Sequence, residues 1–165
     1  AYEYIGKGTG GYQYNNLVTI SRDCGPTSNV PTQEMTQQVG IYEHELQNNP
    51  MGGTDKHRIQ LVTLNRMSVT TIEPDLPGGC AVGASTCIRE GKYEAIVTLQ
   101  ANFTGFHLYA DICCRNGDVA HINNPVNEGT GIHESLPHTF LQNIRPVFTD
   151  LPPTVLCLNV TPSHF

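Results

Sequence analysis

The sequence lacks tryptophan altogether and is poor in charge, above all in positive charge. Its 165 residues include nine Lys and Arg against fifteen Asp and Glu, so the formal net charge is −6, and charged residues make up only 15% of the chain. Globular domains average about 25% charged residues. No basic cluster occurs, and contact with phosphates needs a basic surface. We therefore expect neither a nucleic-acid partner nor an anionic-membrane partner.

Long hydrophobic runs are missing as well. No stretch of about 18 apolar residues occurs, so the sequence predicts no membrane insertion. The first residues also lack the charged region and apolar run of a signal peptide. If the protein is exported, we expect Ala1 to lie past the cleavage site. No segment carries hydrophobic residues at clean helical spacing, which leaves strands as the main regular structure.

Apolar and polar residues instead alternate with a period of two. Segments rich in Val, Ile, Thr, Tyr and Phe are bounded by Gly, Pro, Asn and Asp, which is typical of strands. This pattern predicts an all-β fold, an antiparallel two-sheet sandwich of immunoglobulin-like or jelly-roll-like type, as a single domain over residues 1–165. The expected strands are 12–23, 38–44, 58–73, 92–103, 105–115, 118–122, 145–149 and 153–160. The longest uncertain loops are 24–37 and 123–136.

Six cysteines are present, an even number. They are Cys24, Cys80, Cys87, Cys113, Cys114 and Cys157. Disulfides form in oxidising compartments and are rare in the cytosol. The low charge and the Thr- and Asn-rich composition favour an extracellular location, so we expect these cysteines to staple the sandwich as disulfides. Six cysteines allow fifteen pairings, and the count alone does not choose among them.

The adjacent cysteines Cys113 and Cys114 fall at the end of an expected strand. Successive side chains of a strand point to opposite faces, so the pair suits two separate bridges, one from each face. Cys80 and Cys87 flank a loop of small residues, and a local bridge between them is favoured. Cys24 and a cysteine near the other end of the chain then remain as partners for the adjacent pair, in unknown order. That last cysteine is Cys157.

No catalytic or metal site is expected. Zinc sites usually show two cysteines two to four residues apart, a spacing that the sequence does not contain. The stretch "HESLPH" places His133 and His138 five residues apart, with Pro137 between them. At this spacing the two imidazoles of a helix point in different directions and could not bind the same metal ion. We therefore expect both histidines to lie in a loop. "GKGTGG" lacks the order of a phosphate-binding loop and indicates an entry hairpin. The sequence thus predicts a non-enzyme without a cofactor.

The cysteine-bearing stretches, taken in order, carry a resemblance to a known family. They are "YQYNNLVTISRDCG" (12–25), "CAVGASTCIREGKYEAIVTL" (80–99), "GFHLYADICCRN" (105–116) and "RPVFTDLPPTVLCLN" (145–159). This order resembles the N-terminal region of large surface proteins of Bacteroidota, which include gliding-motility adhesins with tandem PKD-like repeats that leave the cell through the type IX pathway. Residues 25–75 match that pattern poorly.

The resemblance implies a disulfide-stapled β-rich head of a long cell-surface protein, and it implies no catalytic residues. We therefore expect a non-enzymatic extracellular module with a structural or adhesive role. Its partners would be other domains of the same surface protein, neighbouring subunits or surface glycans. Two alternatives remain open. One is a filament subunit that donates its first residues, 1–11, as a strand to a neighbour. The other is a carbohydrate-binding domain, although the lack of tryptophan leaves few stacking surfaces for sugars.

Overall fold

The strands of this protein form one continuous antiparallel sheet. A computed structural model describes residues 1–24, 33–43, 58–72, 87–113, 115 and 121–142. Of these residues, 69% lie in strands. The seven strands follow one another across the sheet in the order β1-β2-β5-β4-β3-β6-β7. Their bounds are Tyr2–Gly8 (β1), Gly11–Asp23 (β2), Thr36–Glu43 (β3), Arg58–Ile72 (β4), Ile88–Leu99 (β5), Phe106–Ile112 (β6) and Thr130–Leu136 (β7).

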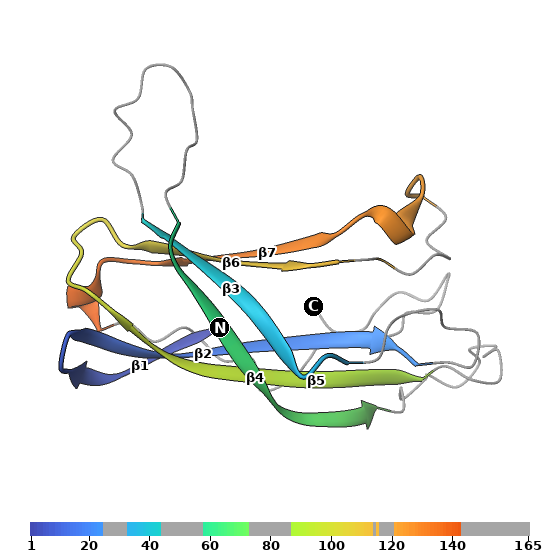
Figure 1. The fold of residues 1–165 in the computed structure, drawn as a ribbon, viewed down its shortest axis with the longest axis horizontal. Coiled ribbons are helices and arrows are strands. Elements are labelled where there is room, and N and C mark those ends of the chain that lie inside the picture. Colours follow the sequence, from blue (N-terminus) through green and yellow to red (C-terminus); the bar gives the residue numbers. More distant parts are fainter. Residues whose placement is uncertain (25–32, 44–57, 73–86, 114, 116–120, 143–165) are drawn as a thin grey trace, which may run out of the picture.

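The sheet is curled into a half-barrel. β3 and β4 cross diagonally between two groups of strands, with β6 and β7 on one side and β1, β2 and β5 on the other (Figure 1). The two groups face each other across the core, much as the sheets of a sandwich would. The all-β, antiparallel class expected from the sequence is thus confirmed. The division into two separate sheets is not, because the described strands are hydrogen-bonded neighbours throughout.

The period-two pattern decides which side chains fill the core. In β5, Tyr93, Val97 and Leu99 are buried, whereas Ile96 points to the outer face and is 63% exposed. This is the alternation that the sequence predicts for the segment. The same rule on the other strands produces a core rich in aromatic and β-branched residues. It comprises Tyr2, Tyr12, Tyr14, Ile20, Val39, Ile41, Val62, Leu64, Tyr93, Val97, Leu99, Phe106, Leu108, Ala110 and Leu136.

The entry hairpin predicted for "GKGTGG" is present. β1 and β2 are joined by a tight turn in which Gly10 has a φ of +102°, a conformation that costs other residues energy but is open to glycine. Next to it, Gly11 approaches β5 so closely that a Cβ atom would collide with the carbonyl oxygen of Leu99. Glycine therefore allows both the turn and the contact between the hairpin and the centre of the sheet.

The segment 123–136 was expected as a loop, and this expectation is wrong for its second half. Residues Thr130–Leu136 form β7, which pairs with β6 from Phe106↔Leu136 to Ile112↔Thr130. Within the described part of the chain, the only helical segments are single 3₁₀ turns at Pro125–Asn127 and Thr139–Leu141, and neither could cross a membrane. The expected strands 145–149 and 153–160 lie outside the described residues, as does most of 118–122.

Candidate functional site

A disulfide joins the ends of two neighbouring strands. Cys24 follows the last residue of β2 and Cys87 precedes the first residue of β5, and the two form a disulfide with Cα atoms 4.9 Å apart. The backbone N–H of Cys24 also donates to the carbonyl oxygen of Cys87 at 2.9 Å. The bridge continues the register of the β2–β5 pair, whose last residues in contact are Asp23 and Ile88. It closes a sequence separation of 63 residues.

This bridge corrects the pairing expected from the sequence. Cys87 is bonded to Cys24, so the local bridge between Cys80 and Cys87 is wrong, and Cys24 is not a partner of Cys113 or Cys114. A short loop between two cysteines favours a local bridge when the sequence alone is considered. What decides the pairing is the non-local register of β2 with β5, which spacing along the chain does not reveal.

The remaining cysteines are described only in part. Cys113 directly follows β6, is exposed and is also disulfide-bonded. No described cysteine is a free thiol, in line with the expectation that the sulfurs serve as crosslinks. Cys80, Cys114 and Cys157 lie outside the described residues, so the expectation that Cys113 and Cys114 serve opposite faces, and the pairing of Cys157, stay predictions.

The histidines of "HESLPH" lie in two different settings. His133 is in β7 rather than in the expected loop, and His138 precedes the 3₁₀ turn at Thr139–Leu141. The Nε2 atom of His133 lies 2.7 Å from the Nδ1 atom of His107 on β6, a contact that nothing in the sequence indicates. In the described residues no group of three or more His, Cys, Asp or Glu side chains could hold a metal ion.

Two phenylalanines form an exposed aromatic patch at one end of the half-barrel. Phe103 is 82% exposed and Phe140 is 43% exposed, and their rings are stacked at 4.6 Å with an interplanar angle of 24°. Tyr12 of β2 supports the patch from below through an edge contact with Phe140 at 5.7 Å. The Nζ atom of Lys7 lies 5.6 Å from the centre of the Tyr12 ring. Aromatic, apolar and cationic groups are thus gathered on one small surface.

Hydrogen bonds hold the two segments that carry this patch. The Oδ1 atom of Asn102 accepts from the backbone N–H groups of Thr104 at 2.6 Å and Gly105 at 2.9 Å. The backbone N–H of Asn102 donates to Oγ1 of Thr139 at 3.0 Å, and the backbone N–H of Thr139 donates to the carbonyl oxygen of Asn102 at 3.1 Å. The loop bearing Phe103 is therefore fixed to the turn bearing Phe140.

A cluster of tyrosines lies beneath the patch, inside the curled sheet. Tyr14 is buried, its ring is 5.5 Å from Tyr4 and 6.1 Å from Tyr2, and its hydroxyl donates to the carbonyl oxygen of Thr139 at 3.4 Å. Burial, followed by the neighbouring phenols of Tyr4, Tyr2 and Tyr12, raises the pKa of Tyr14 to about 12. Tyr14 and its neighbours thus form a tightly packed aromatic layer under the turn at Thr139–Leu141.

Sequence reasoning missed the aromatic patch. Phe103 and Phe140 are 37 residues apart, and Phe103 falls at the end of the expected strand 92–103, in the alternation that fills the core. The structure instead ends β5 at Leu99 and leaves Phe103 exposed. The only available signal was local. Asn102 and Thr104 flank Phe103, and a short polar side chain followed by small residues is typical of a tight turn that leaves the intervening side chain exposed.

Comparisons with known proteins give no relatives. No family model, no curated protein and no solved structure matches this chain.

Proposed function

We propose that this chain is a non-enzymatic extracellular module with a structural and adhesive role in a bacterial cell-surface protein. The observation that carries the proposal is the disulfide between Cys24 and Cys87, because such crosslinks persist in oxidising compartments outside the cytosol. The resemblance of the cysteine-bearing stretches to the head regions of type IX-secreted adhesins of Bacteroidota supports the same role. Neighbouring domains of that surface protein would be its first partners.

The sheet itself suits a load-bearing role. The disulfide joins β2 and β5, which pair with each other over twelve residues. β5 in turn lies between β2 and β4 in the sheet. A pull on either strand end would be resisted by a covalent bond as well as by the ladder of backbone hydrogen bonds. The facing halves of the curled sheet would then behave as a compact sandwich-like head.

Adhesion would use the exposed aromatic patch. Exposed aromatic side chains on a loop that is held rigidly lose little conformational entropy when they bind, so Phe103 and Phe140 are the contact residues we propose. Purified protein with Phe103→Ser should adhere less to cells or coated surfaces than the wild type and keep its unfolding midpoint. Met67→Ser, which removes another exposed apolar side chain on β4, is the matched control. Equal adhesion by all three proteins would contradict this use of the patch.

Location is tested separately on intact cells. Antibody labelling and protease shaving of the source bacterium should reach the protein without lysis, and the isolated protein should lack alkylatable thiols. A protein found only after lysis, or one with six reactive thiols when freshly isolated, would overturn the proposal. These results concern the compartment and not the patch, so the two parts of the proposal can fail independently.

A carbohydrate-binding role is the second candidate, and one observation favours it. Phe103 and Phe140 stack on each other with exposed rings, and aromatic faces can pack against the apolar face of a sugar. A glycan array probed with wild type and with Phe103→Ser should give binding to a sugar class that the variant loses. An array without any signal would remove this role and leave protein-mediated adhesion.

The filament alternative meets one obstacle in the fold. The residues expected to act as a donated strand form β1, which pairs with β2 of the same chain from Tyr2↔Asn16 to Gly8↔Gly11. Donation would require β1 to leave this position. Analytical ultracentrifugation tests it, since a monomer that persists at high concentration is incompatible with an assembling subunit.

A further inference from the structure

Two histidines on neighbouring strands bring one ring nitrogen each to the same point. His107 lies on β6 and His133 on β7, and the Nε2 atom of His133 is 2.7 Å from the Nδ1 atom of His107. The ring centroids are 4.7 Å apart, and the ring planes meet at 38°. Imidazole nitrogen is the commonest protein ligand of metal ions, so two converging ring nitrogens are a candidate metal site.

The register of β6 with β7 fixes the separation of the two rings. His107 is paired with Ser135, and Tyr109 is paired with His133. The two histidines are therefore diagonal neighbours on one face of an antiparallel pair, at a distance that long side chains can span. Because a continuous ladder of backbone pairs carries both residues, their positions do not depend on a loop.

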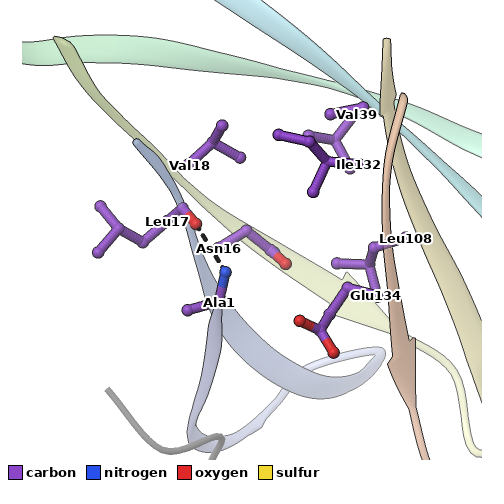
Figure 2. A pocket seen from close by; sticks show the side chains of 9 residues that line it. Ala1, Asn16, Leu17, Val18, Val39, Leu108, Ile132 and Glu134 are labelled. Atoms are coloured by element: carbon purple, nitrogen blue, oxygen red, sulfur yellow. Dashed lines mark hydrogen bonds between the residues drawn. The ribbon is translucent and has the colours of Figure 1, made fainter. Parts of the chain in front are cut away.

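The neighbouring side chains along each strand point to the opposite face. Leu108 is buried in the core, and Glu134 lines a pocket opposite Asn16 on the inner side of the sheet (Figure 2). Successive side chains of a strand alternate between faces, so the imidazoles of His107 and His133 lie on the outer face. His133 is exposed and His107 is half-buried, which leaves the pair accessible to ions in solution.

A glycine leaves room for the two rings to meet. Tyr109, which is paired with His133, lies over Gly131, where an added Cβ atom would be only 2.5 Å from the phenolic oxygen. Tyr109 thus leans along the same diagonal as His107. The space beside His133 is occupied by the ring of His107 and not by the phenol.

The distances between the two rings favour one coordination geometry. Two imidazoles bound at a right angle, with metal–nitrogen bonds of about 2.0–2.1 Å, would have their nitrogens about 2.9 Å and their centroids about 4.5 Å apart. A tetrahedral angle would require about 3.3 Å and about 5.2 Å. The observed 2.7 Å and 4.7 Å are closer to the right angle. Right angles are typical of the square-planar and tetragonal sites that Cu(II) and Ni(II) form with nitrogen and oxygen ligands.

We propose that His107 and His133 bind one divalent transition-metal ion of tetragonal preference, Cu(II) foremost, through Nδ1 and Nε2. Without metal, one of these two nitrogens donates a hydrogen bond to the other. In the metal-bound state both present a lone pair, and the ring protons are on Nε2 of His107 and Nδ1 of His133. Water fills the other positions, and the Oγ atom of Ser135, which is 3.5 Å from Nδ1 of His107, lies close enough to hydrogen-bond such a water.

Bound metal would tie an outer strand to the rest of the sheet. β7 has β6 as its only neighbour in the described sheet, and the ion would add a second kind of link between the two strands. An ion that binds the folded protein and not the unfolded chain also raises stability. The inference does not depend on an adhesive role for Phe103 and Phe140, so the two can fail separately.

The probe is Cu(II) itself, titrated into protein prepared without a histidine tag and followed by electron paramagnetic resonance near neutral pH. The wild type should bind one ion per chain, with a spectrum that shows two nitrogen ligands. His107→Gln and His133→Gln should each weaken binding at least about tenfold and leave one nitrogen ligand. His121→Gln, which removes another exposed histidine, is the matched control and should stay within about twofold of the wild type.

A second readout uses Ni(II), which should raise the unfolding midpoint of the wild type and slow the amide exchange of Thr130–Leu136. The double variant of His107 and His133 should show neither effect. The single substitutions are independent, so if one does not fold the other decides. Copper bound equally by the wild type and the double variant, which would be an adventitious ion only, or a wild-type spectrum with a single nitrogen ligand, would overturn the proposal.

Discussion

At the scale of single residues, the side chain of Gln33 occupies the space that a side chain at position 91 would otherwise fill. Gly91 of β5 has no Cβ, and the side chain of Gln33 fills that place, with its Oε1 atom 2.9 Å from where a Cβ would be. The Nε2 atom of Gln33 donates to the carbonyl oxygens of Ile20 at 3.0 Å and Arg89 at 2.9 Å, and its Oε1 atom accepts from the hydroxyl of Tyr93 at 2.9 Å. One buried amide thus connects β2 and β5 on the core side.

Gln33→Ala should therefore destabilise the protein by about 1–3 kcal/mol, because it removes three hydrogen bonds in a buried setting. Urea unfolding followed by circular dichroism measures the change as a shift of the midpoint. Gln38→Ala, the same substitution at an exposed position of β3, is the control and should stay within about 0.5 kcal/mol of the wild type. Equal midpoints for the two variants would show that Gln33 does not hold the strands together.

Tyr14 makes stability depend on pH in the alkaline range. Its pKa is raised from 10.0 to about 12 in the folded protein, mainly by burial. Between these values the unfolded chain loses the phenolic proton while the folded protein keeps it. The contribution of Tyr14 is therefore complete below pH 10 and is lost as the pH rises towards 12.

Absorbance at about 295 nm, which follows phenolate formation, should show one tyrosine that ionises late, at the pH expected for Tyr14. Tyr14→Phe should remove this late step and weaken the fall of stability above pH 10. The same variant loses the hydrogen bond to Thr139 and should cost about 1 kcal/mol at neutral pH. A titration curve that is unchanged by the substitution would contradict the assignment.

At the scale of elements, the disulfide between Cys24 and Cys87 is a contribution to stability that two substitutions can remove. It closes a separation of 63 residues, for which the chain-entropy model gives about 4 kcal/mol as an upper value. Cys24→Ser with Cys87→Ser should lower the free energy of unfolding by about 2–4 kcal/mol. Chemical denaturation without reductant measures this loss while the disulfide of Cys113 stays intact.

The pairing itself is read from a tryptic digest made without reductant. Cleavage after Lys and Arg places Cys24 in the peptide 23–56, and both Cys80 and Cys87 in the peptide 67–89. The structure predicts that these two peptides are recovered joined, and tandem mass spectrometry should assign the bond to Cys87. Recovery of 67–89 alone with an internal bridge would restore the local pairing that spacing suggests.

The elements differ in how much of them the sequence reveals. β2, β3, β4, β5 and β6 were predictable because each carries Val, Ile, Thr or Tyr in alternation over seven or more residues. β7 was not, since "TGIHESL" has only Ile132 and Leu136 on its core side, with Glu134 between them. Its existence depends on hydrogen bonds to β6, and such non-local pairing leaves little trace in composition.

The same limit applies to the sites. The cysteines were recognisable as crosslinks because of their number and the composition around them. Their pairing was not, because it follows from β2 lying beside β5 across the sheet. The burial of Asn16 could not be predicted for a related reason. Asn16 looks like an ordinary polar residue of an alternating strand, and only the curl of the sheet encloses it opposite Leu108 and Ile132.

At the scale of the whole molecule, one sheet has to supply both sides of the core, and among the described residues no ladder of backbone hydrogen bonds joins its outer strands, β1 and β7. Contact across the opening depends on side chains, as in the hydrogen bond of 3.4 Å from the Tyr2 hydroxyl to the carbonyl oxygen of Ser135. In a closed barrel every strand has two hydrogen-bonded neighbours, so the backbone amides of all strands would be protected from hydrogen exchange alike. In a half-barrel the amides of the middle strands are protected most.

Amide hydrogen exchange distinguishes these two architectures. β5 lies between β2 and β4 and pairs with both over Ile88–Glu94, so the amides near Gly91 and Tyr93 should exchange among the slowest in the described sheet. β7 has β6 as its only neighbour in the described sheet, so every second amide of Thr130–Leu136 should exchange faster by orders of magnitude. The amides of Phe106 to Ala110, which are paired with β3 on one side and β7 on the other, are the internal control for the same end of the sheet. Slow exchange at all amides of β7 would mean that the opening is closed by a further strand, and the protein would then be a barrel or a true sandwich.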